Sequence, residues 1–90
     1  SYINGIEYKV NMKIILIMFV CSQLHGNCLP PIRHVETFTD IYDCMVHGYE
    51  EASKMTQALG KDLVNKDKLY VRFVCKEAPN PIEKETKINI

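Results

Sequence analysis

The chain has 90 residues, of which 47% are apolar and 24% are charged. This length suits one small domain, and the composition is that of a globular protein, which excludes a chain that is disordered throughout. Eleven basic and eleven acidic side chains cancel. The sequence therefore lacks the broad positive charge that attracts nucleic acid or anionic membranes, and we expect no nucleic-acid partner.

Residues 1–11 are predicted to be an N-terminal extension. Ile6, Tyr8 and Val10 alternate with charged residues, a period-two pattern that indicates an extra N-terminal strand. The chain begins with Ser1, and Met12 is a candidate for the true start of translation.

The strongest strand pattern covers residues 13–21, which are rich in isoleucine and apolar on both faces. The apolar run Ile14–Cys21 is far shorter than the roughly 20 residues of a membrane-spanning helix, so we expect no transmembrane segment. An alternative interpretation of residues 12–26 is a signal peptide, because Lys13 precedes the apolar run. The mature protein would then start near Asn27, would be secreted or periplasmic, and would keep three cysteines.

A long connection follows over residues 22–38, in which Pro30 and Pro31 forbid regular helix. A helix is predicted from Thr39 or Asp40, either of which can cap it, to Gly60. Its apolar side chains recur at spacings of three and four. They are Ile41, Cys44, Met45, Gly48, Ala52, Met55 and Leu59.

A second strand is predicted at Leu69–Lys76, after a polar turn over residues 65–68. The predicted fold class is therefore α/β: one strand–helix–strand unit with parallel strands and the helix packed on one sheet face. Residues 12–77 make the single domain. Residues 78–90, with two prolines and many charges, are predicted to be an extended C-terminal tail.

Parallel strands would bring the four cysteines together. Cys21 and Cys75 each end a predicted strand, Cys44 lies in the second helical turn, and Cys28 lies in the loop that joins the same region. A right-handed crossover places all of these at the carboxyl ends of the strands, where open α/β sheets bind ligands.

Three interpretations of this cluster remain open. The cysteines are small buried hydrophobes, or they form disulfides such as Cys28 with Cys44 and Cys21 with Cys75, or they hold zinc. In the zinc interpretation, the extra ligands are His25, His34 and His47. No pair of cysteines has the close spacing of structural zinc sites or of redox motifs, so we expect no cofactor, with zinc as the weak exception. Cys44 and His47 are a conceivable nucleophile and base, but we assign no catalytic residue.

The predicted sheet leaves one face uncovered by a helix. Apolar side chains on that face predict a partner, either another protein or a second copy. Tyr70, Arg72 and Lys76 on one strand face would also suit RNA, but the zero net charge favours a solvated face.

Several segments, taken in order, resemble short uncharacterised proteins encoded by marine phages and found in marine metagenomes. The segments are Met18–Ser22, Cys28–Pro31, Tyr42–Met45 with Gly48–Tyr49, Val64–Asn65 and Tyr70–Cys75. The resemblance covers Met12 to Lys76 and implies no activity. It implies a start near Met12 and the host cytoplasm as the location, where disulfides are disfavoured.

The sequence thus predicts a small non-enzymatic accessory protein that binds another protein. Two alternatives remain: a cysteine site for structural metal or thiol redox chemistry, and a secreted, disulfide-stabilised protein.

Overall fold

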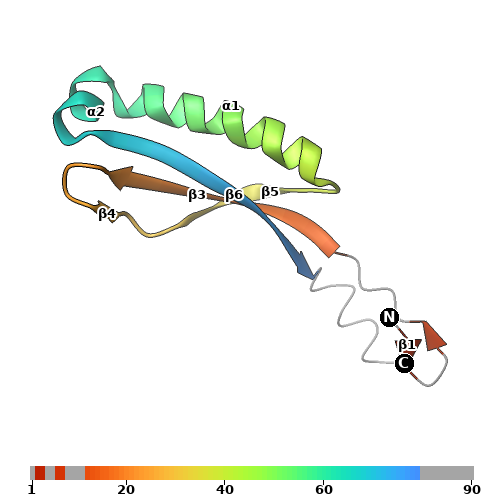
Figure 1. Ribbon diagram of the computed structural model, residues 1–90. Helices are drawn as coiled ribbons and strands as arrows, with labels where there is room; N and C mark the ends of the chain where they lie inside the picture. The colour runs from red at the N-terminus through yellow and green to blue at the C-terminus, as the bar shows by residue number, and fades with distance from the viewer. Residues whose placement is uncertain (1, 4–5, 8–11, 80–90) are drawn as a thin grey trace.

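The computed structural model describes residues 2–3, 6–7 and 12–79 and shows an α+β fold. Both helices lie on the same side of a twisted antiparallel sheet (Figure 1). The elements of this body are β3 (Met12–Ser22), β4 (Asn27–Cys28), β5 (Ile32–Phe38), α1 (Ile41–Leu59), α2 (Lys61–Asp67) and β6 (Leu69–Pro79). A separate antiparallel pair is formed by β1 (Tyr2–Ile3) and β2 (Ile6–Glu7).

The strand β3 is the centre of the sheet. It pairs with β6 over its whole length, from Met12 opposite Pro79 to Ser22 opposite Leu69. Its other edge pairs first with β5 and then, beyond Met18, with β4. The prediction of a central strand at residues 13–21 is confirmed, and it explains why this segment is apolar on both faces.

The predicted parallel α/β arrangement is wrong, because every strand that pairs with β3 is antiparallel to it. The strand–helix–strand unit exists, but its first strand is β5. Since β5 and β6 are both antiparallel to β3, they run in the same direction. The helical segment connects β5 to β6, and β3 lies between these two strands in the sheet. Residues 32–38, predicted to be a connection, form β5, so the crossover joins β5 to β6 rather than β3 to β6.

The helix α1 begins and ends close to where its pattern indicates. The Asp40 side chain caps it by accepting a hydrogen bond from the Asp43 amide at 2.7 Å. Gly60 ends it with φ at 92°, a conformation that residues with a Cβ rarely adopt. The caps thus fix both ends of the helix that packs on the sheet.

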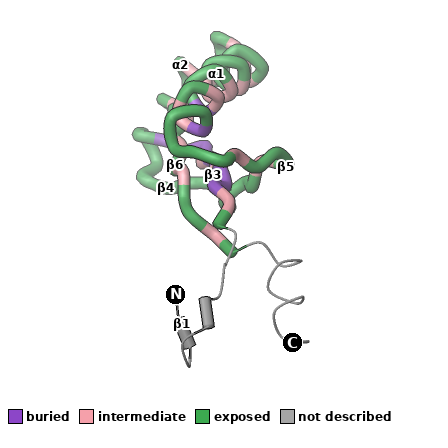
Figure 2. The backbone as a smooth tube through the Cα atoms, turned by 90° about the vertical axis from the view of Figure 1, so that its right-hand side faces the viewer, coloured by how far each residue is buried: buried purple, intermediate pink, exposed green. Residues whose placement is uncertain are grey.

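The core lies between α1 and the sheet. Ile14, Leu16 and Met18 of β3 point at the helix and pack around the fully buried Cys44. Figure 2 shows that the buried residues gather where the two layers meet. Side chains of β6 alternate between half-buried on this side and exposed on the other.

Residues 61–67, expected to end in a polar turn, form the short helix α2. Lys68 ends it in the left-handed conformation, at φ 54°. Ser22 ties this region to the sheet, because its buried hydroxyl donates to the Asp67 carbonyl at 2.7 Å and accepts from the His25 amide at 3.0 Å.

The two predicted terminal segments are only partly described. The predicted N-terminal strand includes Tyr8 and Val10, which lie outside the described residues, while Ile6 belongs to β2. The predicted C-terminal tail begins at residue 78, but β6 continues to Pro79. Residues 80–90 lie outside the described residues.

Candidate functional site

The predicted cluster of four cysteines does not form. Cys21 lies opposite Tyr70 on β6, whereas Cys75 lies opposite Leu16 of β3, five residues away along the strand. Five residues of a strand correspond to about 17 Å. Antiparallel pairing is the cause, since it places the ends of β3 and β6 at opposite ends of the sheet.

The cysteines form two local disulfides instead. Cys21 bonds to Cys28 across β3 and β4, and Cys44 of α1 bonds to Cys75 of β6. These bridges replace the expected pairs Cys28–Cys44 and Cys21–Cys75. All four sulfur atoms are consumed, so the cysteines are not metal ligands in this structure. The Cys44–Cys75 disulfide also leaves Cys44 without a thiol, so it cannot serve as a nucleophile with His47 as its base.

The three histidines separate into one lone residue and one pair. His25 lies in the turn after β3, with its side chain 60% exposed and 3.9 Å from a carboxylate oxygen of Asp67. His34 of β5 and His47 of α1 lie together, with ring centroids 4.9 Å apart. Glu36 and Glu51 each place a carboxylate oxygen within 3.6 Å of the Nε2 atom of His47.

The sheet face opposite the helices, which we term the open face, is apolar at its centre. Its residues follow from the register, because directly paired residues of antiparallel strands share a face. The buried Ile15 and the half-buried Ile17 and Phe19 of β3 lie here, beside the exposed Tyr70 and Val74 of β6. None of the described helices covers them (Figure 1).

The charged side chains of the open face are all basic. They are Lys13, Arg33, Arg72 and Lys76, which pair with Ala78, Ile17, Phe19 and Ile15 respectively. By contrast, α1 contains three acidic residues and one lysine. The zero net charge of the chain therefore conceals a separation, with positive charge on the open face and negative charge on the helical layer.

Arg72 and Phe19 are in direct contact on the open face. The guanidinium carbon of Arg72 lies 4.5 Å from the centre of the Phe19 ring, a cation–π geometry. The contact covers one side of this ring with a charged group. The open face thus offers an aromatic and aliphatic strip whose rim is positive.

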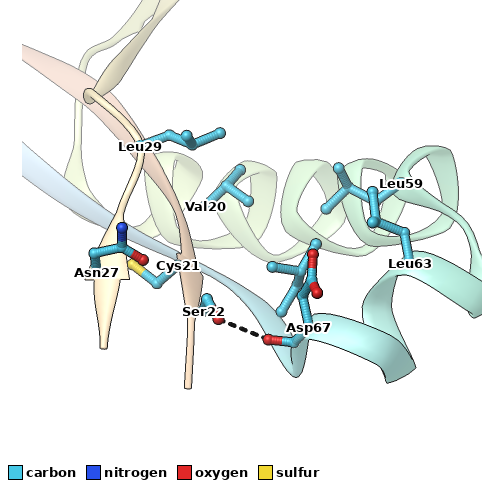
Figure 3. A pocket seen from close by; sticks show the side chains of 9 residues that line it. Val20, Cys21, Ser22, Asn27, Leu29, Leu59, Leu63 and Asp67 are labelled. Carbon is cyan, nitrogen blue, oxygen red and sulfur yellow. Dashed lines mark hydrogen bonds between the residues drawn. The ribbon is translucent and has the colours of Figure 1, made fainter. Parts of the chain in front are cut away.

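On the side of the sheet that carries the helices, a pocket of about 240 Å³ opens where α1, α2 and the end of β3 meet (Figure 3). Its walls are mainly leucine and valine, with Leu29 and Leu63 exposed at its mouth. The lining residues are Val20, Cys21, Ser22, Asn27, Leu29, Leu59, Leu63, Asp67 and Leu69. Sites for drug-sized molecules usually exceed 300 Å³, so this pocket is smaller than such sites.

Comparison with known proteins assigns this chain to no family. No family model, no curated protein and no solved structure matches the chain. Among the described residues, neither helix has the length and the apolar character that crossing a bilayer requires.

Sequence reasoning named His34 and His47 but did not bring them together, and it missed Glu36 and Glu51. The alternation of residues 32–38 was the available signal. Ile32, His34, Glu36 and Phe38 occupy every second position, which is the spacing of a strand with one face toward a neighbouring layer.

Proposed function

We propose that this chain is a small, disulfide-stabilised, non-enzymatic protein that binds the acidic surface of another protein on its open face. The observation that carries the proposal is an apolar strip that no described helix covers, partly exposed at Ile17, Phe19, Tyr70 and Val74, with a rim whose described charged side chains are all basic. Apolar contact supplies affinity, and charge complementarity selects the partner and accelerates the encounter.

A protein partner suits the open face better than a nucleic acid does. Base stacking needs several free aromatic faces, but the Phe19 ring is already covered on one side by Arg72, which leaves Tyr70 as the exposed aromatic residue of the described open face. Two disulfides also favour an oxidising compartment, where nucleic acids are not the usual ligands. This supports a secreted or periplasmic protein over the host cytoplasm, and the expected origin in marine phages stays a prediction.

The proposed exported protein must retain residues 12–26. These residues contain the central strand β3, and Cys21 within them bonds to Cys28. Cleavage before Asn27 would remove the strand to which β4, β5 and β6 are all paired.

Selection from a library of displayed random peptides tests the proposal. The wild-type protein should enrich peptides that combine acidic with aromatic or aliphatic residues. Arg72→Glu with Lys76→Glu should abolish that enrichment, because both charges on the β6 rim are reversed. The matched control is Lys54→Glu with Lys61→Glu, which reverses two exposed lysines on the helical layer and should keep the selected peptides.

Three results would contradict the proposal. The first is equal loss of binding in the control variant. The second is tight binding of a thymidine oligonucleotide at physiological salt, which would assign the face to nucleic acid. The third is a concentration-dependent dimer that Arg72→Glu with Lys76→Glu dissociates, since the occupant would then be a second copy.

A further inference from the structure

The strand β5 carries a bulge at the edge of the sheet. Thr37 pairs with Ile15 and Arg33 pairs with Ile17, so β5 places three residues where β3 places one. These extra residues include His34 and Glu36, which face α1, and Val35, which is 93% exposed on the opposite side. Bulges often re-aim side chains beside functional sites. This bulge brings an imidazole and a carboxylate to the same side of an edge strand.

The helix supplies a second imidazole at the same place. Donor atoms of His34, Glu36 and His47 all lie within 4.8 Å of one another. The Nε2 atom of His47 is 3.4 Å from Oε1 of Glu36 and 3.6 Å from Oε1 of Glu51. Zinc bonds of about 2.0–2.2 Å in a tetrahedron place neighbouring donor atoms roughly 3.4 Å apart. The two distances from His47 match that geometry, and the wider spread of the donor set requires the His34 and Glu51 side chains to move closer around the ion.

The His47 nitrogen at the centre of this group has no hydrogen-bond partner among the described residues. Its Nε2 atom is buried and makes no hydrogen bond to any of the described residues, although two carboxylates lie beside it. Buried nitrogen atoms nearly always have a partner, and those without one need an explanation. A metal ion placed between the imidazoles and the carboxylates would supply that partner.

We propose that His34, Glu36 and His47 bind a divalent transition-metal ion such as zinc, with Glu51 as the fourth ligand. Imidazole nitrogen together with carboxylate oxygen suits zinc, whereas calcium and magnesium take oxygen ligands alone. The ion would join the bulge of β5 to α1, on the sheet edge opposite β6. It would thus hold an edge strand that no disulfide reaches.

Binding has to exchange one hydrogen bond for a metal bond. The Nδ1 atom of His34 accepts from the Glu36 amide at 3.1 Å, so the neutral ring carries its proton on Nε2. A metal ion can coordinate the His34 ring only after the hydrogen bond from the Glu36 amide to Nδ1 is broken or the ring rotates by half a turn. The Glu36 amide resonance should therefore shift when zinc is added, and this reports on the site directly.

Titration calorimetry of the oxidised protein with zinc chloride tests the assignment, because the disulfides exclude thiol ligands. The protein should bind one zinc ion and neither magnesium nor calcium. His34→Gln and Glu36→Gln should each weaken binding by roughly tenfold or more, since even indirect changes around metal sites reach this size. Both residues lie on the edge bulge, so the fold should survive. Cobalt in place of zinc should give the visible absorption of a tetrahedral ion.

The chain provides a matched control in its third histidine. His25→Gln removes an exposed imidazole from a turn outside the group and should leave zinc affinity unchanged. Zinc binding that is lost in His25→Gln, or that is unchanged in both His34→Gln and Glu36→Gln, would overturn the assignment. Absence of zinc binding by the wild-type protein would do the same.

Discussion

Gly48 of α1 lies against the ring of Phe73 on β6, so closely that a Cβ atom at position 48 would overlap the ring. This contact sets how near the helix approaches the sheet. It also explains a glycine in the middle of a long helix, where glycine normally costs about 1 kcal/mol relative to alanine.

Gly48→Ala should therefore destabilise the protein, by about 1–3 kcal/mol in urea unfolding, because overlap outweighs the gain in helix propensity. The same substitution in a Phe73→Leu background should cost less, since the smaller side chain leaves room. Equal cost in both backgrounds would show that the two residues are not coupled.

Removal of the Cys44–Cys75 bridge, by replacing both residues with alanine, should lower the free energy of unfolding by roughly 3–4 kcal/mol. Removal of Cys21–Cys28 should cost less, roughly 2–3 kcal/mol, because that bridge spans 7 residues rather than 31. Chemical denaturation without reductant measures both. Peptide mapping of the unreduced wild-type protein checks the pairing, and a Cys28–Cys44 peptide would contradict it.

Asp40→Ala should cost about 0.5–2 kcal/mol, because the Asp43 amide loses the carboxylate that caps α1. Asp40→Asn should retain most of the stability, since the amide oxygen can accept the same hydrogen bond. Thermal unfolding followed by circular dichroism distinguishes the two variants. An asparagine variant as unstable as the alanine variant would assign the effect to charge rather than to capping.

Ser22→Ala should cost about 1–3 kcal/mol, because it leaves the Asp67 carbonyl and the His25 amide without their shared partner. Hydrogen exchange should accelerate most in α2 and in the turn after β3, which this hydroxyl connects. Ser53→Ala, on the exposed surface of α1, is the control and should change stability little. Uniform acceleration across the whole sheet would argue against a local role.

The elements with continuous patterns were predictable from the sequence. The segment of β3 is a continuous apolar run, α1 and β6 each show a regular period, and the caps at Asp40 and Gly60 mark the helix ends. The strand β5 was not found, because it follows two prolines and is largely exposed, so its alternation lacks the apolar face of a buried strand. Without β5, the direction of β6 could not be inferred.

The site was less predictable than the fold. Four cysteines allow three pairings, and only the strand directions decide between them. The grouping of His34 with His47 depends on β5 lying beside α1, which no local spacing encodes. The basic character of the open face likewise emerges only when β3, β5 and β6 are placed in register.

The pairing of β3 with β6 has a consequence for how the protein is made. The two strands are separated by the whole length of the helical segment, so β6 leaves the ribosome last among the paired strands. Until β6 is synthesised, one edge of β3 has no strand to pair with and Cys44 lacks its disulfide partner Cys75. Cys21 and Cys28, by contrast, are only 7 residues apart in the sequence. We therefore expect the short bridge to close first on the nascent chain, and the sheet to be complete only after synthesis has passed Pro79.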